Sequence, residues 1–151
     1  MKTRISRQRE KGQSLVEFAL SIVLVMLLIV GSIELIVMIY TYSVLADAAK
    51  EGVRYGIVHG TGLGASCSGP GGGGVACTDA TAANVTTAVE NFAAFSLHDK
   101  NAMTITPTYP DGSSVSPSRV RVTVSYIYQP LFGLGWPTMT VNAAAEGRIA
   151  F

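Results

Sequence analysis

Glu17 is the first residue with unusual chemistry for its position, because its carboxylate lies just inside a long apolar segment. At the centre of a membrane-spanning helix an acid costs about 2.5–3.5 kcal/mol on insertion scales, and the cost falls toward the membrane boundary. Two interpretations stay open. Glu17 is either an acid that reaches for the aqueous boundary or a charge retained for a partner molecule.

Glu34 is a second acid in the same apolar segment. It follows Glu17 by a helical distance of roughly 25 Å, which puts it near the opposite boundary of a membrane. One interpretation is an interfacial acid. The other is a helix–helix contact within an assembly, which the small residues Gly31 and Ser32 would favour by letting two backbones approach.

Residue types for catalysis do not cluster in this sequence. The two histidines, His59 and His98, are isolated, and no Ser-His-Asp order is credible. The glycine run 69–74 lacks the preceding strand, following helix and Lys-Ser/Thr pair of a phosphate-binding loop. The sequence therefore predicts a protein that is not an enzyme and that binds no cofactor or metal. The acids of residues 60–151 are scattered: Asp79, Glu90, Asp99, Asp111 and Glu146.

Charge is distributed unevenly along the 151 residues. Residues 1–12 hold five Lys or Arg against one acid, whereas the rest holds six basic and nine acidic residues. Charged residues make up 14% of the chain, against roughly 25% in an ordinary soluble domain. The net charge of +1 argues against a nucleic-acid-binding protein.

An apolar run from Leu15 to Tyr42 follows this basic leader. As a helix it would be roughly 42 Å long, more than the roughly 30 Å of a bilayer's hydrocarbon core. The basic leader predicts a cytoplasmic N-terminus and an exported C-terminal part. A cleaved secretory signal would share these features, but the run is long and no small-x-small cleavage site ends it. A buried core helix would need more protein to cover it.

The remaining sequence predicts an α+β fold. We expect a basic leader (1–12), a transmembrane helix (13–42), its helical continuation (43–59) and an extracytoplasmic domain (60–151). In that domain a helix over 79–95 would pack on a short antiparallel sheet of strands 103–109, 119–129 and 139–151. The residues expected on the buried face of this helix are Ala82, Val85, Val89, Phe92 and Phe95.

Two loops of the domain have features of their own. Cys67 and Cys77 flank the glycine-rich loop, and on an exported domain they should form a disulfide. The loop Pro130–Pro137 is rich in apolar residues and could be a contact surface or fold under the sheet; both remain open. Its apolar members are Leu131, Phe132, Leu134 and Trp136.

The sequence around Gly12, Lys-Gly-Gln-Ser-Leu-Val-Glu-Phe at 11–18, resembles the prepilin-peptidase site of type IV pilin-like proteins. More narrowly, residues 11–59 resemble the TadE-like family of the Tad (Flp) pilus system, with a faint likeness again at 139–151. The supporting segments are Gly12–Leu20, Gly31–Leu35 and Ala48–Gly56. Ordinary pilins usually begin with an aromatic or apolar residue where this chain has Gln13, which suits a TadE-like pseudopilin better.

The resemblance implies cleavage by a prepilin peptidase between Gly12 and Gln13, which makes Glu17 the fifth residue of the mature chain. A glycine at the cut site leaves no Cβ in the way of the protease. The freed amine of Gln13 could pair with Glu17 of a neighbouring subunit and offset part of its desolvation. Residues expected in helix packing and assembly are Glu17, Phe18, Gly31 and Glu34.

The function this implies is a membrane-anchored subunit that assembles a Tad/Flp-type pilus, or is a minor component of it, for adhesion or secretion. Its partners would be the lipid bilayer, the prepilin peptidase, other pilin-like subunits and the pilus assembly machinery. It would lie in the cytoplasmic membrane as a single-pass protein, and after processing in an extracellular pilus. The main alternative is a single-span extracytoplasmic binding module that never polymerises, and a weaker one is a membrane-tethered enzyme.

Overall fold

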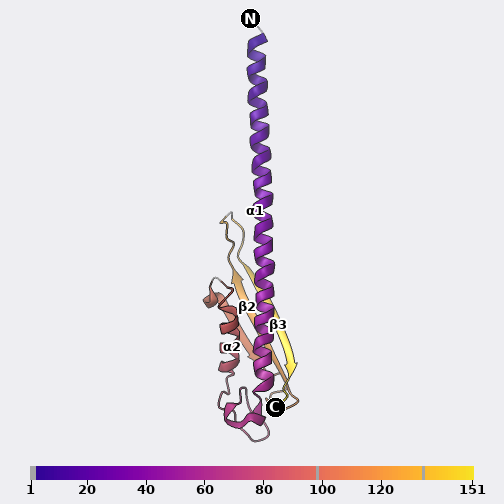
Figure 1. Cartoon of the computed structure of the whole chain (residues 1–151), viewed down its shortest axis with the longest axis vertical. Coiled ribbons are helices and arrows are strands. Elements are labelled where there is room, and N and C mark those ends of the chain that lie inside the picture. The colour runs from indigo at the N-terminus through magenta and orange to yellow at the C-terminus, as the bar shows by residue number, and fades with distance from the viewer. Residues whose placement is uncertain (1–2, 98, 134) are drawn as a thin grey trace.

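One helix, α1 (Thr3–Val58), is the long axis of the molecule and carries a small domain around its C-terminal half (Figure 1). The computed structural model describes residues 3–97, 99–133 and 135–151, and only the backbone of residues 3–11 and Lys100. The side chains of the basic leader, His98 and Leu134 therefore lie outside the described residues. The helical continuation expected over 43–59 is present, since α1 runs on past residue 42 and ends at Val58, one residue early.

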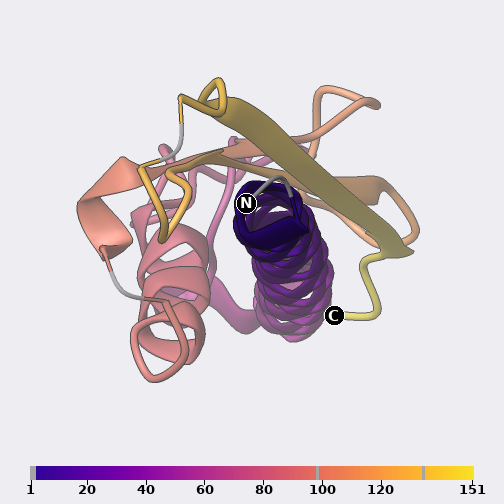
Figure 2. The ribbon, with the colours of Figure 1, turned by 90° about the horizontal axis from the view of Figure 1, so that it is seen from above.

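The sheet is a three-stranded antiparallel meander in the order β1-β2-β3. Its strands are β1 (Met103–Thr108), β2 (Arg119–Tyr128) and β3 (Met139–Arg148). The register aligns Ile105 with Val124 and Val124 with Ala143. The sheet forms one layer, and α1 and α2 (Ala83–Ala93) lie side by side on one of its faces (Figure 2). The predicted α+β architecture is confirmed.

The hydrophobic core lies between the sheet and the lower half of α1. Alternate residues of β2 point into it, with Val120, Val122 and Val124 fully buried, as the sequence predicted. Small residues of α1 allow the helix to approach the sheet closely. A Cβ built on Gly52 would overlap Val89 and lie 3.3 Å from Cγ1 of Val122. Glycine at this position therefore serves packing, although it weakens the helix itself.

Helix α2 is shorter than the predicted range 79–95. It begins at Ala83 because Ala82 takes a left-handed conformation, with φ of 57°. Asp79 still caps the helix, since its carboxylate accepts hydrogen bonds from the amides of Ala83 (2.7 Å) and Asn84 (2.8 Å).

The expected burial of Phe92 and Phe95 is wrong. Phe92 is 42% exposed and Phe95, beyond the helix end, is 94% exposed. The buried face is instead formed by Val85, Val89 and Ala93, which recur every four residues. Ala93, which has a small side chain, faces the core at the end of the helix where the sequence predicted Phe92 and Phe95.

The glycine-rich loop at the base of the domain is closed by the predicted disulfide between Cys67 and Cys77. Ser114, which is fully buried, lies in the segment between β1 and β2 and joins that segment to the glycine-rich loop. Its hydroxyl accepts a hydrogen bond from the amide of Gly71 (2.9 Å), and its own amide donates to the carbonyl of Gly71 (2.8 Å). The predicted last strand ends three residues early, at Arg148, where Ile149 turns to bond the carbonyl of Ser118.

Candidate functional site

The predicted processing site lies on an uninterrupted, exposed part of α1. Gly12, Gln13 and Glu17 are all exposed, and nothing lies within 4 Å of a Cβ built on Gly12. The side-chain amide of Gln13 donates a hydrogen bond to Oε1 of Glu17 (3.1 Å), one helical turn away. In the single chain Glu17 thus has a neutral partner, and its carboxylate is open to a further one.

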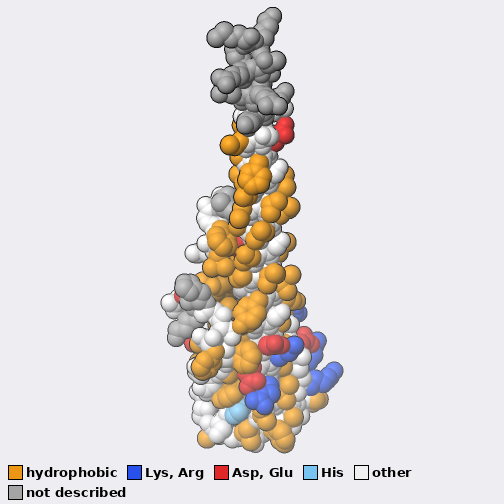
Figure 3. Space-filling model, turned by 45° about the horizontal axis from the view of Figure 1, so that its top comes forward, with side chains coloured by type: hydrophobic (Ala, Val, Ile, Leu, Met, Phe, Trp, Pro, Cys, Tyr) orange, Lys and Arg blue, Asp and Glu red, His pale blue; other side chains and the backbone are white. Residues whose placement is uncertain are grey.

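The apolar shaft of α1, residues 15–29, stands free of the domain. Its large side chains are 45–68% exposed, and Phe18, one of the predicted assembly residues, is 68% exposed. Figure 3 shows this shaft as a nearly continuous apolar column above the domain. An exposed apolar surface of this extent needs lipid or protein around it. α1 is also the one helix, among the described residues, long and apolar enough to cross a membrane.

Glu34 is 4% exposed and is bound by the chain's own sheet. The phenolic hydroxyl of Tyr128 donates to its Oε2 (2.6 Å), and the amide of Phe132 donates to its Oε1 (2.8 Å). Each carboxylate oxygen therefore has a donor. The sequence suggested either an exposed acid at the membrane interface or a helix–helix contact within an assembly. The structure shows a third arrangement, in which donors from the same chain bind Glu34.

Gly31 receives the side chain of Trp136. A Cβ built on Gly31 would lie 3.8 Å from Cη2 of the tryptophan ring, which is ordinary van der Waals contact. The expected role of Gly31 in packing thus has an intramolecular component. The segment between β2 and β3 is neither free nor folded under the sheet, because it lies along α1 while Leu131 (65%), Phe132 (41%) and Trp136 (45%) stay partly exposed.

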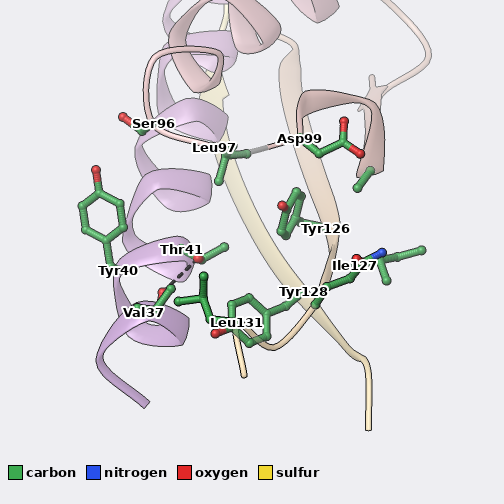
Figure 4. A pocket seen from close by; sticks show the side chains of 12 residues that line it. Val37, Tyr40, Thr41, Ser96, Leu97, Asp99, Tyr126, Ile127, Tyr128 and Leu131 are labelled. Carbon is green, nitrogen blue, oxygen red and sulfur yellow. Dashed lines mark hydrogen bonds between the residues drawn. The ribbon is translucent and has the colours of Figure 1, made fainter. Parts of the chain in front are cut away.

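A pocket of about 520 Å³ opens beside Tyr128 and Leu131. In Figure 4 it is bounded by Val37 and Thr41 of α1, Tyr126 and Tyr128 of β2, and Leu97 of the segment after α2. Burial and the hydrogen bond to Glu34 raise the pKa of Tyr128 to about 12, so its hydroxyl remains a donor at neutral pH. The pocket's described lining includes one carboxylate, Asp99, and no histidine or cysteine.

A second polar cluster stands at the opposite end of the domain and is structural. Ser68 donates to Oδ2 of Asp79 (2.6 Å), and Tyr109 donates to the carbonyl of Ser68 (3.2 Å). Burial alone would raise the pKa of Asp79, but hydrogen bonds from Ser68 and the α2 amides lower it below its usual value. Burial and the nearby Asp79 raise the pKa of Tyr109 to about 12. These groups stabilise the start of α2.

The comparison with known families concerns the exposed helix and its junction with the domain. Residues 12–54 match the family of TadE-like proteins. The resemblance inferred from the residues around Gly12 is thereby confirmed for this segment, and it indicates a membrane-anchored protein associated with a Tad pilus. No curated protein and no solved structure shows significant similarity to the chain.

The TadE-like segment includes Gly12, Glu17, Gly31 and Glu34 but ends before the sheet. The residues that bind Glu34 lie outside it. Tyr128 and the amide of Phe132 were not predicted from the sequence as partners of Glu34. Residues 122–145 contain no charged side chain, which marks this strand pair as unusually apolar but does not identify a donor. Among the described residues, no group of three His, Cys, Asp or Glu could hold a metal ion.

Proposed function

We propose that the chain is a pilin-like subunit that acts in the assembly of a Tad/Flp-type pilus or is a minor component of it. The observation that carries this proposal is the TadE-like match at residues 12–54 on a helix whose apolar shaft is bare. Such a shaft associates side by side with lipid in the membrane and with other pilin-like helices in a fibre. The role we propose is structural rather than enzymatic.

We propose a transmembrane span shorter than the apolar run. Residues 13–30 would form a helix roughly 27 Å long, close to the roughly 30 Å of the hydrocarbon core. From Gly31 onward the helix is accompanied by the domain, since Trp136 and Phe132 contact it there. The basic leader favours an N-terminus on the cytoplasmic side and a domain on the outer side.

We further propose that a prepilin peptidase cleaves between Gly12 and Gln13. Two local features support it: the site is exposed and Gly12 is sterically open. Cleavage would give Gln13 a charged amine, and the exposed Glu17 of a neighbouring subunit could bind that amine. The side chain of Gln13, which holds Glu17 in the single chain, would be displaced or would share the carboxylate.

The experiment is to isolate the protein from cells that produce the pilus machinery and to determine the mass of its N-terminal peptide. We expect a chain beginning at Gln13, and a full-length product from cells without the prepilin peptidase. Gly31→Ala is a matched control for Gly12→Ala, because it changes a glycine of the same helix away from the cut site. Processing should fail only in Gly12→Ala.

A second measurement separates the two functions considered from the sequence. Shearing the cells should release the protein with the pili if it enters the fibre, or its loss should abolish pili if it assists assembly. A protein that stays with the membrane, in cells whose pili are unaffected by its deletion, would instead be the non-polymerising binding module.

A further inference from the structure

The segment joining β2 to β3, residues 129–138 and here called the β2–β3 loop, carries an inference about how the domain meets the membrane. It rests on the proposed spanning of the membrane by α1. The loop extends beyond the sheet along α1 toward the N-terminus (Figure 1). It contains no charged residue, and its Leu131, Phe132 and Trp136 are 41–65% exposed.

Charge is segregated along the sheet. In the β2–β3 pair the register aligns Arg119 with Arg148 and Arg121 with Glu146, and every charged residue of the two strands is among these four. The other end of the pair, where Tyr128 faces Met139, is charge-free and leads into the loop. In the view of Figure 3 most charged side chains of the domain lie in its lower half, with apolar side chains both above and below them. Within the strand pair this gradient suits an apolar or interfacial surrounding at the uncharged end, although Asp99 also lines the pocket beside Tyr128.

The depth of the loop follows from its contacts with α1. Trp136 packs on Gly31, and Phe132 binds Glu34 through its amide. If the basic leader ends at the inner boundary, Gly31 stands roughly 28 Å along the helix from Gly12, at the outer boundary of the hydrocarbon core. Tryptophan and tyrosine are enriched at this depth in membrane proteins.

Glu34 explains why the loop would be needed at that depth. A carboxylate at the edge of the hydrocarbon is unfavourable unless it is hydrogen-bonded. Tyr128 and the amide of Phe132 supply donors to both of its oxygens, while the loop's apolar side chains remain available to lipid. The end of β2 and the loop after it thus cover Glu34, and the surface they expose there is apolar.

We propose that the β2–β3 loop inserts into the outer membrane interface beside α1, so that the domain is seated on the bilayer by two elements instead of one. The occupant of the exposed apolar surface of Leu131, Phe132 and Trp136 is lipid. The continuity of this surface with the bare shaft of α1 favours lipid over a protein partner in the membrane-resident state.

The single tryptophan of the chain is in the loop, which makes the test direct. The full-length protein is reconstituted in phosphatidylcholine vesicles, with or without lipids brominated near the carbonyl end of their chains. We expect Trp136 emission to be shifted to the blue, quenched by the brominated lipid and little affected by aqueous iodide. Quenching by iodide without quenching by bromolipid would overturn the proposal, as would protection from both, which would mean that protein covers the loop.

Two reporter variants separate this inference from the proposed function. In Trp136→Phe/Phe18→Trp the tryptophan is on the shaft of α1, and in Trp136→Phe/Phe151→Trp it is at the far end of the domain. Bromolipid should quench the first and iodide the second. If bromolipid quenches the Phe18→Trp reporter but not Trp136, the loop inference alone fails. If it quenches neither, the membrane-spanning role of α1 fails as well.

Discussion

The hydroxyl of Tyr128 donates a hydrogen bond to Oε2 of Glu34 over 2.6 Å, joining residues 94 positions apart in the sequence. Tyr128 is the last residue of β2, and Glu34 lies three residues after Gly31, the position of α1 that Trp136 contacts. This bond ties a buried acid of the helix to the end of the central strand. The β2–β3 loop begins directly after Tyr128, and its own contacts with α1 are those of Phe132 with Glu34 and of Trp136 with Gly31.

Replacing Tyr128 by Phe should destabilise the domain and loosen the loop. The variant leaves Oε2 of a buried carboxylate without its donor. The free-energy cost of an unpaired buried group is generally larger than the net contribution of an ordinary hydrogen bond to stability. We expect a fall of several degrees in the Tm of the detergent-solubilised protein, measured by near-UV circular dichroism, and a red shift of Trp136 emission. Tyr126→Phe is the matched control, because that hydroxyl has no hydrogen-bond partner among the described residues.

Glu34→Gln tests whether the two groups act together. An amide retains one acceptor oxygen but loses the charge, so Tyr128→Phe should be less damaging in the Glu34→Gln background than in the wild type. A double-mutant cycle on the same Tm measurement gives this coupling. If the Tm changes of the two single variants simply add in the double variant, the hydrogen bond is not the cause of the loss of stability.

Acid should weaken the domain through Asp111. Hydrogen bonds from the side chain and amide of Arg119 lower the pKa of Asp111 to about 2, below its usual value near 4. A carboxyl whose pKa is lower in the folded state stabilises that state above its unfolded pKa, and this stabilisation is lost as the pH falls through the folded pKa. The wild type should therefore lose stability between about pH 5 and pH 2 more steeply than Asp111→Asn.

Asp47→Asn is the control for this titration. Asp47 is paired with Lys50 one turn away on an exposed helix face, where such pairs contribute only a few tenths of a kcal/mol. Its acid profile should follow that of the wild type. An Asp111→Asn profile parallel to the wild type would show that the ion pair with Arg119 does not contribute to acid stability.

Removing the disulfide should destabilise the base of the domain. The bridge closes a loop with a sequence separation of 10, for which chain entropy predicts a loss of roughly 3 kcal/mol in the free energy of unfolding. Cys67→Ala/Cys77→Ala and the reduced wild type should show the same loss in denaturant titrations. Since Ser114 still bonds Gly71 in both, we expect the folded domain to remain. Equal stability of oxidised and reduced protein would contradict the prediction.

Local pattern was enough to predict the elements but not the contacts between distant ones. The alternation of β2 identified its buried face, and the charge-free run identified α1, because both signals are periodic or continuous in the sequence. Hydropathy could not divide α1 at Gly31, since the exposed side chains of the shaft and those that face the domain are equally apolar. The partners of Glu34 were missed because a buried acid predicts that donors exist without indicating which strand end supplies them.

Gly52→Ala should destabilise the domain although alanine is the better helix former. The substitution favours the helix by about 1 kcal/mol, whereas overpacking a close contact generally costs about 1–3 kcal/mol. At Gly52 the added methyl group would overlap Val89 and approach Cγ1 of Val122 to 3.3 Å, and both valines are fully buried. Because the added methyl group would overlap Val89, the packing cost should lie in the upper part of that range. We therefore expect a net loss of about 1–2 kcal/mol in denaturant titrations of the detergent-solubilised protein.

The control is Gly31→Ala, in the same helix, where the added Cβ would lie 3.8 Å from Cη2 of Trp136, an ordinary contact, and stability should not fall. Val89→Ala provides the complementary test, because it removes the methyl group nearest to the new side chain. The double variant Gly52→Ala/Val89→Ala should lose less stability than the sum of the two single changes. If Gly52→Ala is instead as stable as the wild type, α1 does not approach the sheet as closely as these contacts require.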